Sequence, residues 1–174
     1  MAKRFLTALY AVFLCFVILL MSACTTQEAD PAIMTKFTAD FTADYNDMTV
    51  KGSVTSGGFG ALSISITYPQ TLSGLNINYK NSEVQLSREQ IVCTADEAFI
   101  PQNGFPSVIS AALNEIAYNR MNFVSQNESE LTYEFKISIG GCTVDFDKDG
   151  LIRKISVPSA KLYAEFSNVK AIGT

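Results

Sequence analysis

FTADFTADY, from Phe37 to Tyr45, is the stretch of sequence that decides the fold. Phenylalanine, alanine and tyrosine occupy every second position, and threonine and aspartate stand between them. Because successive side chains of a β-strand point to opposite faces, this alternation gives a strand with one apolar and one polar face. The stretch therefore predicts an antiparallel sheet with one face in the core and the other in water.

The same alternation recurs along the chain and predicts further strands. They fall at residues 62–68, 75–79, 84–86, 91–94, 122–124, 131–139, 142–146, 151–157 and 161–169. The period changes once, between Phe105 and Tyr118, where apolar residues have helical spacing and Pro106 suits the first turn. A single helix leaves much of such a sheet uncovered, so the sheet is expected to curl. The predicted fold class is mainly β (α+β), an antiparallel curled sheet or half-barrel of about ten strands with one central helix packed on its concave face.

The N-terminal segment is typical of an export signal. Two basic residues near the N-terminus precede an apolar run from Phe5 to Met21, and the small residues Ser22 and Ala23 stand before Cys24. The run is close to the lower limit of the ~17 to 25 residues that cross a bilayer, so a retained transmembrane anchor is one alternative. The small residues before the cysteine favour cleavage instead.

Leu20-Met21-Ser22-Ala23-Cys24 resembles the lipobox of bacterial lipoproteins, although Met21 stands where leucine is usual. The resemblance implies that Cys24 is lipidated and becomes the first residue of a protein held on the extracytoplasmic face of the cell membrane. An ordinary signal peptide with a chance cysteine is the other interpretation. The predicted organisation is a lipoprotein signal peptide at 1–23, a lipidated tether at 24–35 and one β domain at 36–174.

Length and charge then limit the function. Removing residues 1–23 from the 174-residue chain leaves 151 residues, which suits a single domain. Without Lys3 and Arg4, 11 of the 13 basic residues remain against 17 acidic ones, a net charge of −6. This charge disfavours nucleic acid as a partner and gives no attraction to anionic headgroups, so the acyl chains must supply membrane binding. The chain has no histidine, which removes the commonest neutral-pH acid or base and metal ligand, and we expect no enzyme activity, metal or cofactor.

The order of strands around one central helix resembles the lipoprotein-carrier superfamily of LolA, LolB and LppX. That resemblance implies an open half-barrel closed over an apolar cavity. More closely, the run from Phe37 to Leu86, with Tyr68-Pro69 ending a strand and Leu72-Ser73-Gly74-Leu75 opening the next, is similar to small uncharacterised lipoproteins of Gram-positive bacteria. No residue here matches the arginine-controlled lid of LolA or the protruding loop of LolB, so no functional residue is carried over.

Ten apolar residues at alternate strand positions are either core or the lining of a cavity, and sequence does not separate the two. We expect a monomer that binds a lipid-like or lipoprotein ligand there. The alternative is an envelope module that docks a protein by a sheet edge or patch, without a small ligand. The ten are Phe37, Phe41, Ile64, Ile66, Leu75, Ile77, Tyr133, Phe135, Ile137 and Phe166.

Cys93 and Cys142 are the thiols that remain once the leader is removed and Cys24 is lipidated. An exported protein can oxidise them to a disulfide, which would stabilise the fold by ~4 kcal/mol on the chain-entropy model. Two unpaired cysteines in separate strands are the other interpretation, and both stay open. Neither cysteine stands in a CxxC motif, so redox catalysis is not indicated.

The segment Asp145-Phe146-Asp147-Lys148-Asp149-Gly150 resembles the start of a calcium loop. Such a loop needs a glutamate at its twelfth position, where this chain has Ser156. A hairpin turn is therefore favoured over a metal site. A carboxylate pair for hydrolysis is a weaker hypothesis than a solvated face for seven other acidic residues. These are Asp40, Asp44, Asp47, Glu83, Glu89, Asp96 and Glu97.

Overall fold

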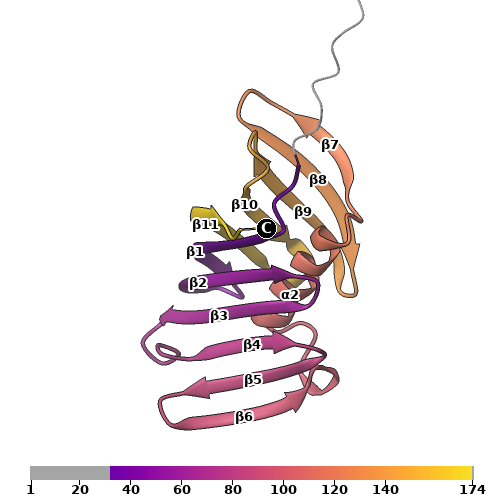
Figure 1. Ribbon diagram of the computed structural model, residues 1–174. Coiled ribbons are helices and arrows are strands. Elements are labelled where there is room, and N and C mark those ends of the chain that lie inside the picture. Colours follow the sequence, from indigo (N-terminus) through magenta and orange to yellow (C-terminus); the bar gives the residue numbers. More distant parts are fainter. Residues whose placement is uncertain (1–31, 174) are drawn as a thin grey trace, which may run out of the picture. The chain divides into compact units, whose positions relative to one another are not determined.

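The computed structural model describes residues 32–173 (Figure 1). The described residues belong to one compact unit, residues 31–174. The predicted signal peptide, Cys24 and the first part of the tether lie outside the described residues. Within residues 32–173, no helix is long and apolar enough to cross a membrane.

Among residues 32–173, eleven strands form one antiparallel sheet in the order β6-β5-β4-β3-β2-β1-β11-β10-β9-β8-β7. Two meanders, β1 to β6 and β7 to β11, join where β1 pairs with β11, and β6 and β7 are the free edges (Figure 1). This confirms the predicted mainly β class. The strands are β1 Lys36–Tyr45, β2 Met48–Gly58, β3 Ala61–Tyr68, β4 Asn76–Lys80, β5 Glu83–Arg88, β6 Ile91–Asp96, β7 Asn122–Gln126, β8 Glu130–Ile137, β9 Gly140–Asp147, β10 Ile152–Val157 and β11 Leu162–Ala171.

β2 is the strand that the alternation does not predict. Its buried positions include Gly52 and Ser56, which add no apolar side chain to the pattern. Gly52 is required by packing, because a Cβ there would overlap the carbonyl oxygen of Ser65 on β3. The register between the two strands shifts at the same place, between Lys51 and Gly52. A close backbone approach therefore replaces side-chain packing at this point.

The helix α2, Phe105–Ala117, confirms the predicted helix and ends one residue earlier. It follows Gly104, carries proline in its first turn, and buries one apolar stripe. α2 contacts β2 in the first meander and β8 in the second, so it lies against the same face of both. We call this side of the sheet the inner face. Two short 3-10 turns, η1 Glu97–Phe99 and η2 Pro158–Ala160, complete the fold.

The sheet is not strongly curled, so the expected half-barrel is wrong in this respect. In Figure 1, β2 to β6 lie side by side, and β7 to β10 run steeply across their direction. This is the twist that strands adopt without closure. Because α2 packs on both meanders, the helix covers the central part of the sheet. The sheet does not need to roll up on itself to cover that part.

The end of the predicted tether is part of the folded unit. The amide of Met34 donates to the carbonyl of Gly150 at 3.0 Å, and the hydroxyl of Ser56 donates to the carbonyl of Thr35 at 2.7 Å. A Cβ at Gly150 would overlap the carbonyl oxygen of Ala32. Residues 32–34 therefore lie along the β9–β10 turn, and Thr35 lies beside β2.

Candidate binding surface on the inner face

The ten apolar side chains predicted as core or cavity lining all lie in or against one core. Leu75 and Ile137 are partly buried and pack against it. The other eight are at most 7% exposed, and they are Phe37, Phe41, Ile64, Ile66, Ile77, Tyr133, Phe135 and Phe166. Sequence left open whether these positions form the core or line a cavity, and in the structure all eight belong to the packed core. Phe135 also borders a cleft that is described below.

Aromatic rings connect this core to α2 and to one free edge. Phe41 of β1 packs against Phe105 of α2 with ring centroids 5.6 Å apart. In the second meander, Phe146 meets Tyr133 edge to face at 5.8 Å, and Tyr133 meets Phe123 of β7 at 5.7 Å. The row passes from a fully buried ring at Phe146 to one that is 51% exposed at Phe123. The inner face therefore remains apolar where it reaches solvent.

The opposite edge shows the same feature on β6. Val84 of β5 is buried and pairs directly with Ala95, which places Ala95, and by alternation Cys93 and Ile91, on the inner face. Ile91 is 75% exposed, and Cys93 is also exposed. The apolar inner face thus extends past the cover of α2 at both ends of the sheet.

A cleft of about 400 Å³ opens beside α2. Both meanders border it, through the β4–β5 turn and the β8–β9 turn. Just beside it, the hydroxyls of Tyr79 and Ser107 lie 3.2 Å apart. Burial raises the pKa of Tyr79, the Ser107 hydrogen bond opposes this, and Glu97 adds to the increase. The cleft is lined by Ser82, Asp96, Glu97, Ala98, Ile100, Gln102, Ser107, Ala111 and Ser138.

A second cleft, of about 510 Å³, lies at the start of β7. Arg120 stands at its edge, with the guanidinium 4.7 Å from the centre of the Tyr118 ring and 3.4 Å from the carboxylate of Glu115. Sequence reasoning missed Arg120, because its partners give no periodic signal. The cleft is lined by Arg120, Asn122, Glu134, Phe135, Lys136, Gly141, Cys142, Thr143 and Pro158.

Cys93 and Cys142 are free and far apart in the sheet, so a disulfide between them is not supported. Cys93 is on the edge strand β6, and Cys142 is on β9, with seven strands between them in the sheet order. Cys142 is buried, and burial raises the pKa of its thiol to about 12. Neighbouring strands of a sheet are ~4.8 Å apart, whereas disulfide Cα atoms lie within ~7 Å, so pairing would require refolding.

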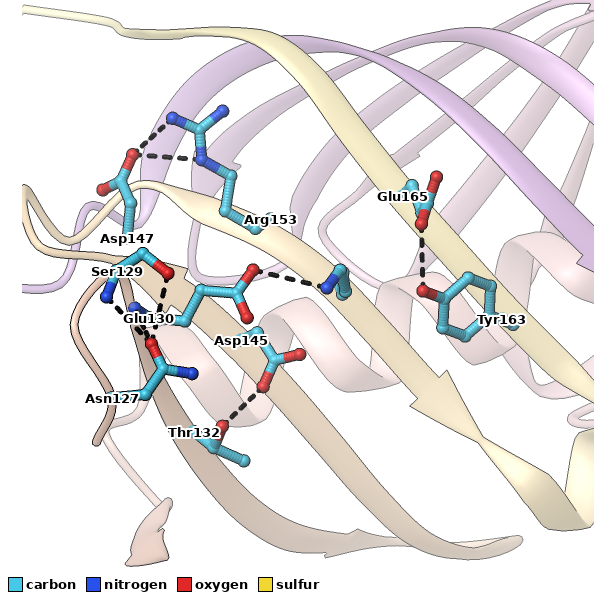
Figure 2. Close-up of polar contacts among 10 residues, drawn as sticks. Asn127, Ser129, Glu130, Thr132, Asp145, Asp147, Arg153, Tyr163 and Glu165 are labelled. Carbon is cyan, nitrogen blue, oxygen red and sulfur yellow. Dashed lines mark hydrogen bonds and ion pairs between the residues drawn. The ribbon is translucent and has the colours of Figure 1, made fainter. Parts of the chain in front are cut away.

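Asp145 to Asp147 end β9, and Lys148 to Gly150 form the hairpin turn to β10, as predicted. One carboxylate oxygen of Asp147 accepts hydrogen bonds from the amides of Asp149 and Leu151, at 3.0 and 2.9 Å. The other accepts two from the Arg153 guanidinium, at 3.1 and 2.6 Å (Figure 2). Gly150 has a positive φ of 75°. The Asp147 carboxylate is thus used to close the turn. Among residues 32–173, no three His, Cys, Asp or Glu side chains are grouped to hold a metal.

The outer face of the second meander is polar. Figure 2 shows Thr132 donating to Asp145 at 2.8 Å and Tyr163 donating to Glu165 at 2.9 Å. The ammonium of Lys154 donates to Glu130 at 3.3 Å, and this hydrogen bond raises the pKa of Lys154. The Tyr163–Glu165 contact lies within β11 and the other two join different strands, and all three belong to a solvated face, in contrast to the apolar inner face.

The seven acidic residues that the sequence offered as a carboxylate pair are exposed, and three of them make local hydrogen bonds. Asp40 accepts from the amide of Asn168, Asp44 accepts from the hydroxyl of Thr49, and Asp96 caps η1. Asp47 and Glu89 lie in turns, while Glu83 begins β5 and Glu97 begins η1. Asp96 and Glu97 are the two that border the cleft beside α2. The solvated-face interpretation accounts for all seven.

No protein-family model and no curated protein matches the chain. Among solved structures, it is similar to a LolA superfamily protein from Nitrosomonas europaea, with a TM-score of 0.44 and 10% identity, over 83% of this chain and 90% of that one. It is also similar to a DUF1329 family protein from Desulfovibrio piger, with a TM-score of 0.39 and 8% identity, over 79% of this chain and 86% of that one.

Proposed function

We propose that this protein is a membrane-tethered, non-enzymatic binding module on the extracytoplasmic side of a cell envelope, with a lipid or lipoprotein as its ligand. The observation that carries the proposal is the uncovered part of the inner face. Ile91 at one edge and Phe123 at the other expose large apolar side chains on the same face that forms the core. Apolar surface of this kind commonly marks a site of binding.

Dimensions explain why this surface is uncovered. Eleven strands at ~4.8 Å spacing extend roughly 50 Å across the sheet. A helix of 13 residues is roughly 20 Å long and ~10 Å wide. One helix of this size cannot cover both ends, so a ligand with an apolar surface would complete the layer over the inner face.

The tether rests on the resemblance of residues 20–24 to a lipobox. Growth with labelled fatty acid tests it, because the label should enter the wild-type protein and be absent from Cys24→Ser. Cys93→Ser is the matched control, since Cys93 is also exposed but lies in the folded domain. Equal labelling of the wild type and Cys24→Ser, or equal membrane partitioning of the two, would remove the anchor from the proposal.

The ligand is tested with two adjacent residues on opposite faces of β6. The full-length protein is extracted gently from its host, and copurified lipid is measured by mass spectrometry. Ile91→Ser should lower the bound lipid several-fold, whereas Val92→Ser should leave it unchanged, because Val92 is on the outer face. Both side chains are largely exposed, so neither change should affect folding. No lipid on the wild type, or equal loss from both variants, would count against the proposal.

A further inference from the structure

The charged side chains on the outer face of β8 are paired at one end of the strand and unpaired at the other. Glu130, at the start of β8, pairs with Lys154 of β10 at 3.3 Å. Further along the same face, Glu134 and Lys136 form no ion pair within residues 32–173. The cleft of about 510 Å³ opens at this unpaired end, and both side chains line it.

Gly141 of β9 helps to keep this cleft open. It pairs directly with Lys136, so a side chain at position 141 would project from the same face of the sheet. Its φ lies outside the left-handed region, and a Cβ there would have no atom within 4 Å. Neither the backbone conformation nor the packing requires glycine at this position. The effect of the glycine is therefore to leave space beside Lys136.

The lining of the cleft carries two cations and one carboxylate. Arg120 and Lys136 are the cations, and Glu134 is the carboxylate. One guanidinium nitrogen of Arg120 contacts Glu115 at 3.4 Å, and the other N–H groups of the guanidinium are available to a ligand. Arginine and lysine both bind phosphate, whereas a carboxylate pairs with an ammonium group. The three charges therefore complement a group that contains a phosphate and an ammonium.

An exposed aromatic pair continues from the cleft. The guanidinium of Arg120 lies 4.7 Å from the centre of the Tyr118 ring, and the Tyr118 ring lies 5.5 Å from that of Phe59. Both rings are exposed. Phe59 has a φ of 28° in the β2–β3 turn, and the turn is fixed to α2 because the amide of Gly60 donates to the side chain of Asn114 at 2.8 Å. A charged cleft beside an apolar surface fits an amphiphile better than a free ion.

We propose that this cleft binds the headgroup of one phospholipid that carries a phosphate and a primary ammonium, as phosphoethanolamine does. Arg120 and Lys136 hold the phosphate, Glu134 pairs with the ammonium, and the acyl chains leave across Tyr118 and Phe59. The inference rests on the proposed function for a lipid as the ligand. It adds the class of headgroup and the residues that select it.

Native mass spectrometry of the full-length protein in a non-ionic detergent tests the headgroup. Phosphatidylethanolamine and diacylglycerol with the same acyl chains are added in equal amounts, and the wild type should bind the phospholipid in preference. Arg120→Gln and Lys136→Gln should each lower this preference about threefold, because exposed charge pairs contribute little individually. Lys51→Gln is the matched control, since Lys51 is exposed on β2 and does not line the cleft.

Glu134 tests the ammonium. Glu134→Gln should shift binding from phosphatidylethanolamine towards phosphatidylglycerol, whose headgroup has a phosphate and no ammonium. Inorganic phosphate at the same concentration should not displace the lipid, because it makes no contact with the aromatic pair.

Gly141→Leu tests the cleft itself. The leucine side chain should occupy the cleft and remove the preference for the phospholipid. It should not lower the urea midpoint, because the position is open and its backbone is unstrained. Gly173→Leu is the matched control, since a Cβ at Gly173 also has no atom within 4 Å and this residue does not line the cleft.

The outcomes separate this inference from the proposed function. Equal binding of phosphatidylethanolamine and diacylglycerol by the wild type would overturn the inference alone, since acyl chains on the inner face would account for it. An unchanged preference in Glu134→Gln or Gly141→Leu, or displacement of the lipid by inorganic phosphate, would do the same. A wild-type protein that binds no lipid would overturn both.

Discussion

β1, in the middle of the sheet, and β6, at one edge, differ most in what covers their side chains. β1 pairs on both sides, with β2 and β11, and its Phe41 packs against Phe105 of α2. β6 pairs only with β5, and its inner-face residues Ile91 and Cys93 are exposed. Both strands place apolar side chains on the inner face. Burial in this part of the chain therefore depends on neighbouring strands and on the reach of α2.

The sharpest test of this comparison truncates one inner-face side chain in each strand. Phe37 is 1% exposed, so Phe37→Ala should lower the free energy of unfolding by about 3 to 5 kcal/mol. Ile91→Ala should change it by less than about 0.5 kcal/mol, since the side chain is mostly in water already. Urea unfolding of both variants measures the difference. Similar losses would show that the edge is covered in solution.

The next test concerns the backbone contact between interior strands. Gly52→Ala should destabilise the fold by about 1 to 3 kcal/mol, because the added Cβ meets the Ser65 carbonyl and forces β2 and β3 apart. Gly141→Ala is the control, since a Cβ there has no atom within 4 Å. Thermal or urea unfolding compares the two. A neutral Gly52→Ala would mean that β2 and β3 do not approach this closely.

The buried thiol of Cys142 makes the stability of the fold depend on pH. Burial raises the pKa of Cys142 from 9.0 to about 12, so the native state keeps a proton that the unfolded chain releases. The resulting stability is complete below pH 9 and is lost as the pH rises from 9 to about 12. Cys142→Val should therefore lose less stability over this range than the wild type, measured by urea unfolding at several pH values.

Cys93→Ser is the control for this experiment, because it removes a thiol that lies outside the core. Alkylation at neutral pH provides a second readout, in which Cys93 reacts readily and Cys142 reacts only on unfolding. Equal reaction of both thiols in the folded protein would contradict the burial of Cys142.

The same comparison shows how far sequence reasoning reaches. Alternation at residues 37–45 predicted β1 and its faces, and helical spacing predicted α2, because both patterns come from local geometry. β2 was not predicted, because Gly52 and Ser56 interrupt its apolar face. The missing curl, the exposure of Ile91 and the separation of Cys93 from Cys142 depend on which strands become neighbours. A single sequence carries no periodic signal for that arrangement.

The outer face of an interior strand provides the smallest expected effect. Lys154 lies on β10, within the sheet, but its ammonium pairs with Glu130 on the solvated face at 3.3 Å. Because both side chains are about one-third exposed, water screens the pair, and Lys154→Ala should cost less than about 1 kcal/mol. Added salt should reduce the loss further, as measured by urea unfolding at low and high ionic strength. A loss close to that of Phe37→Ala would show that strand position, and not the face of the sheet, decides how much a side chain contributes. The small loss that we expect means that an interior strand behaves like an edge wherever its side chains meet water.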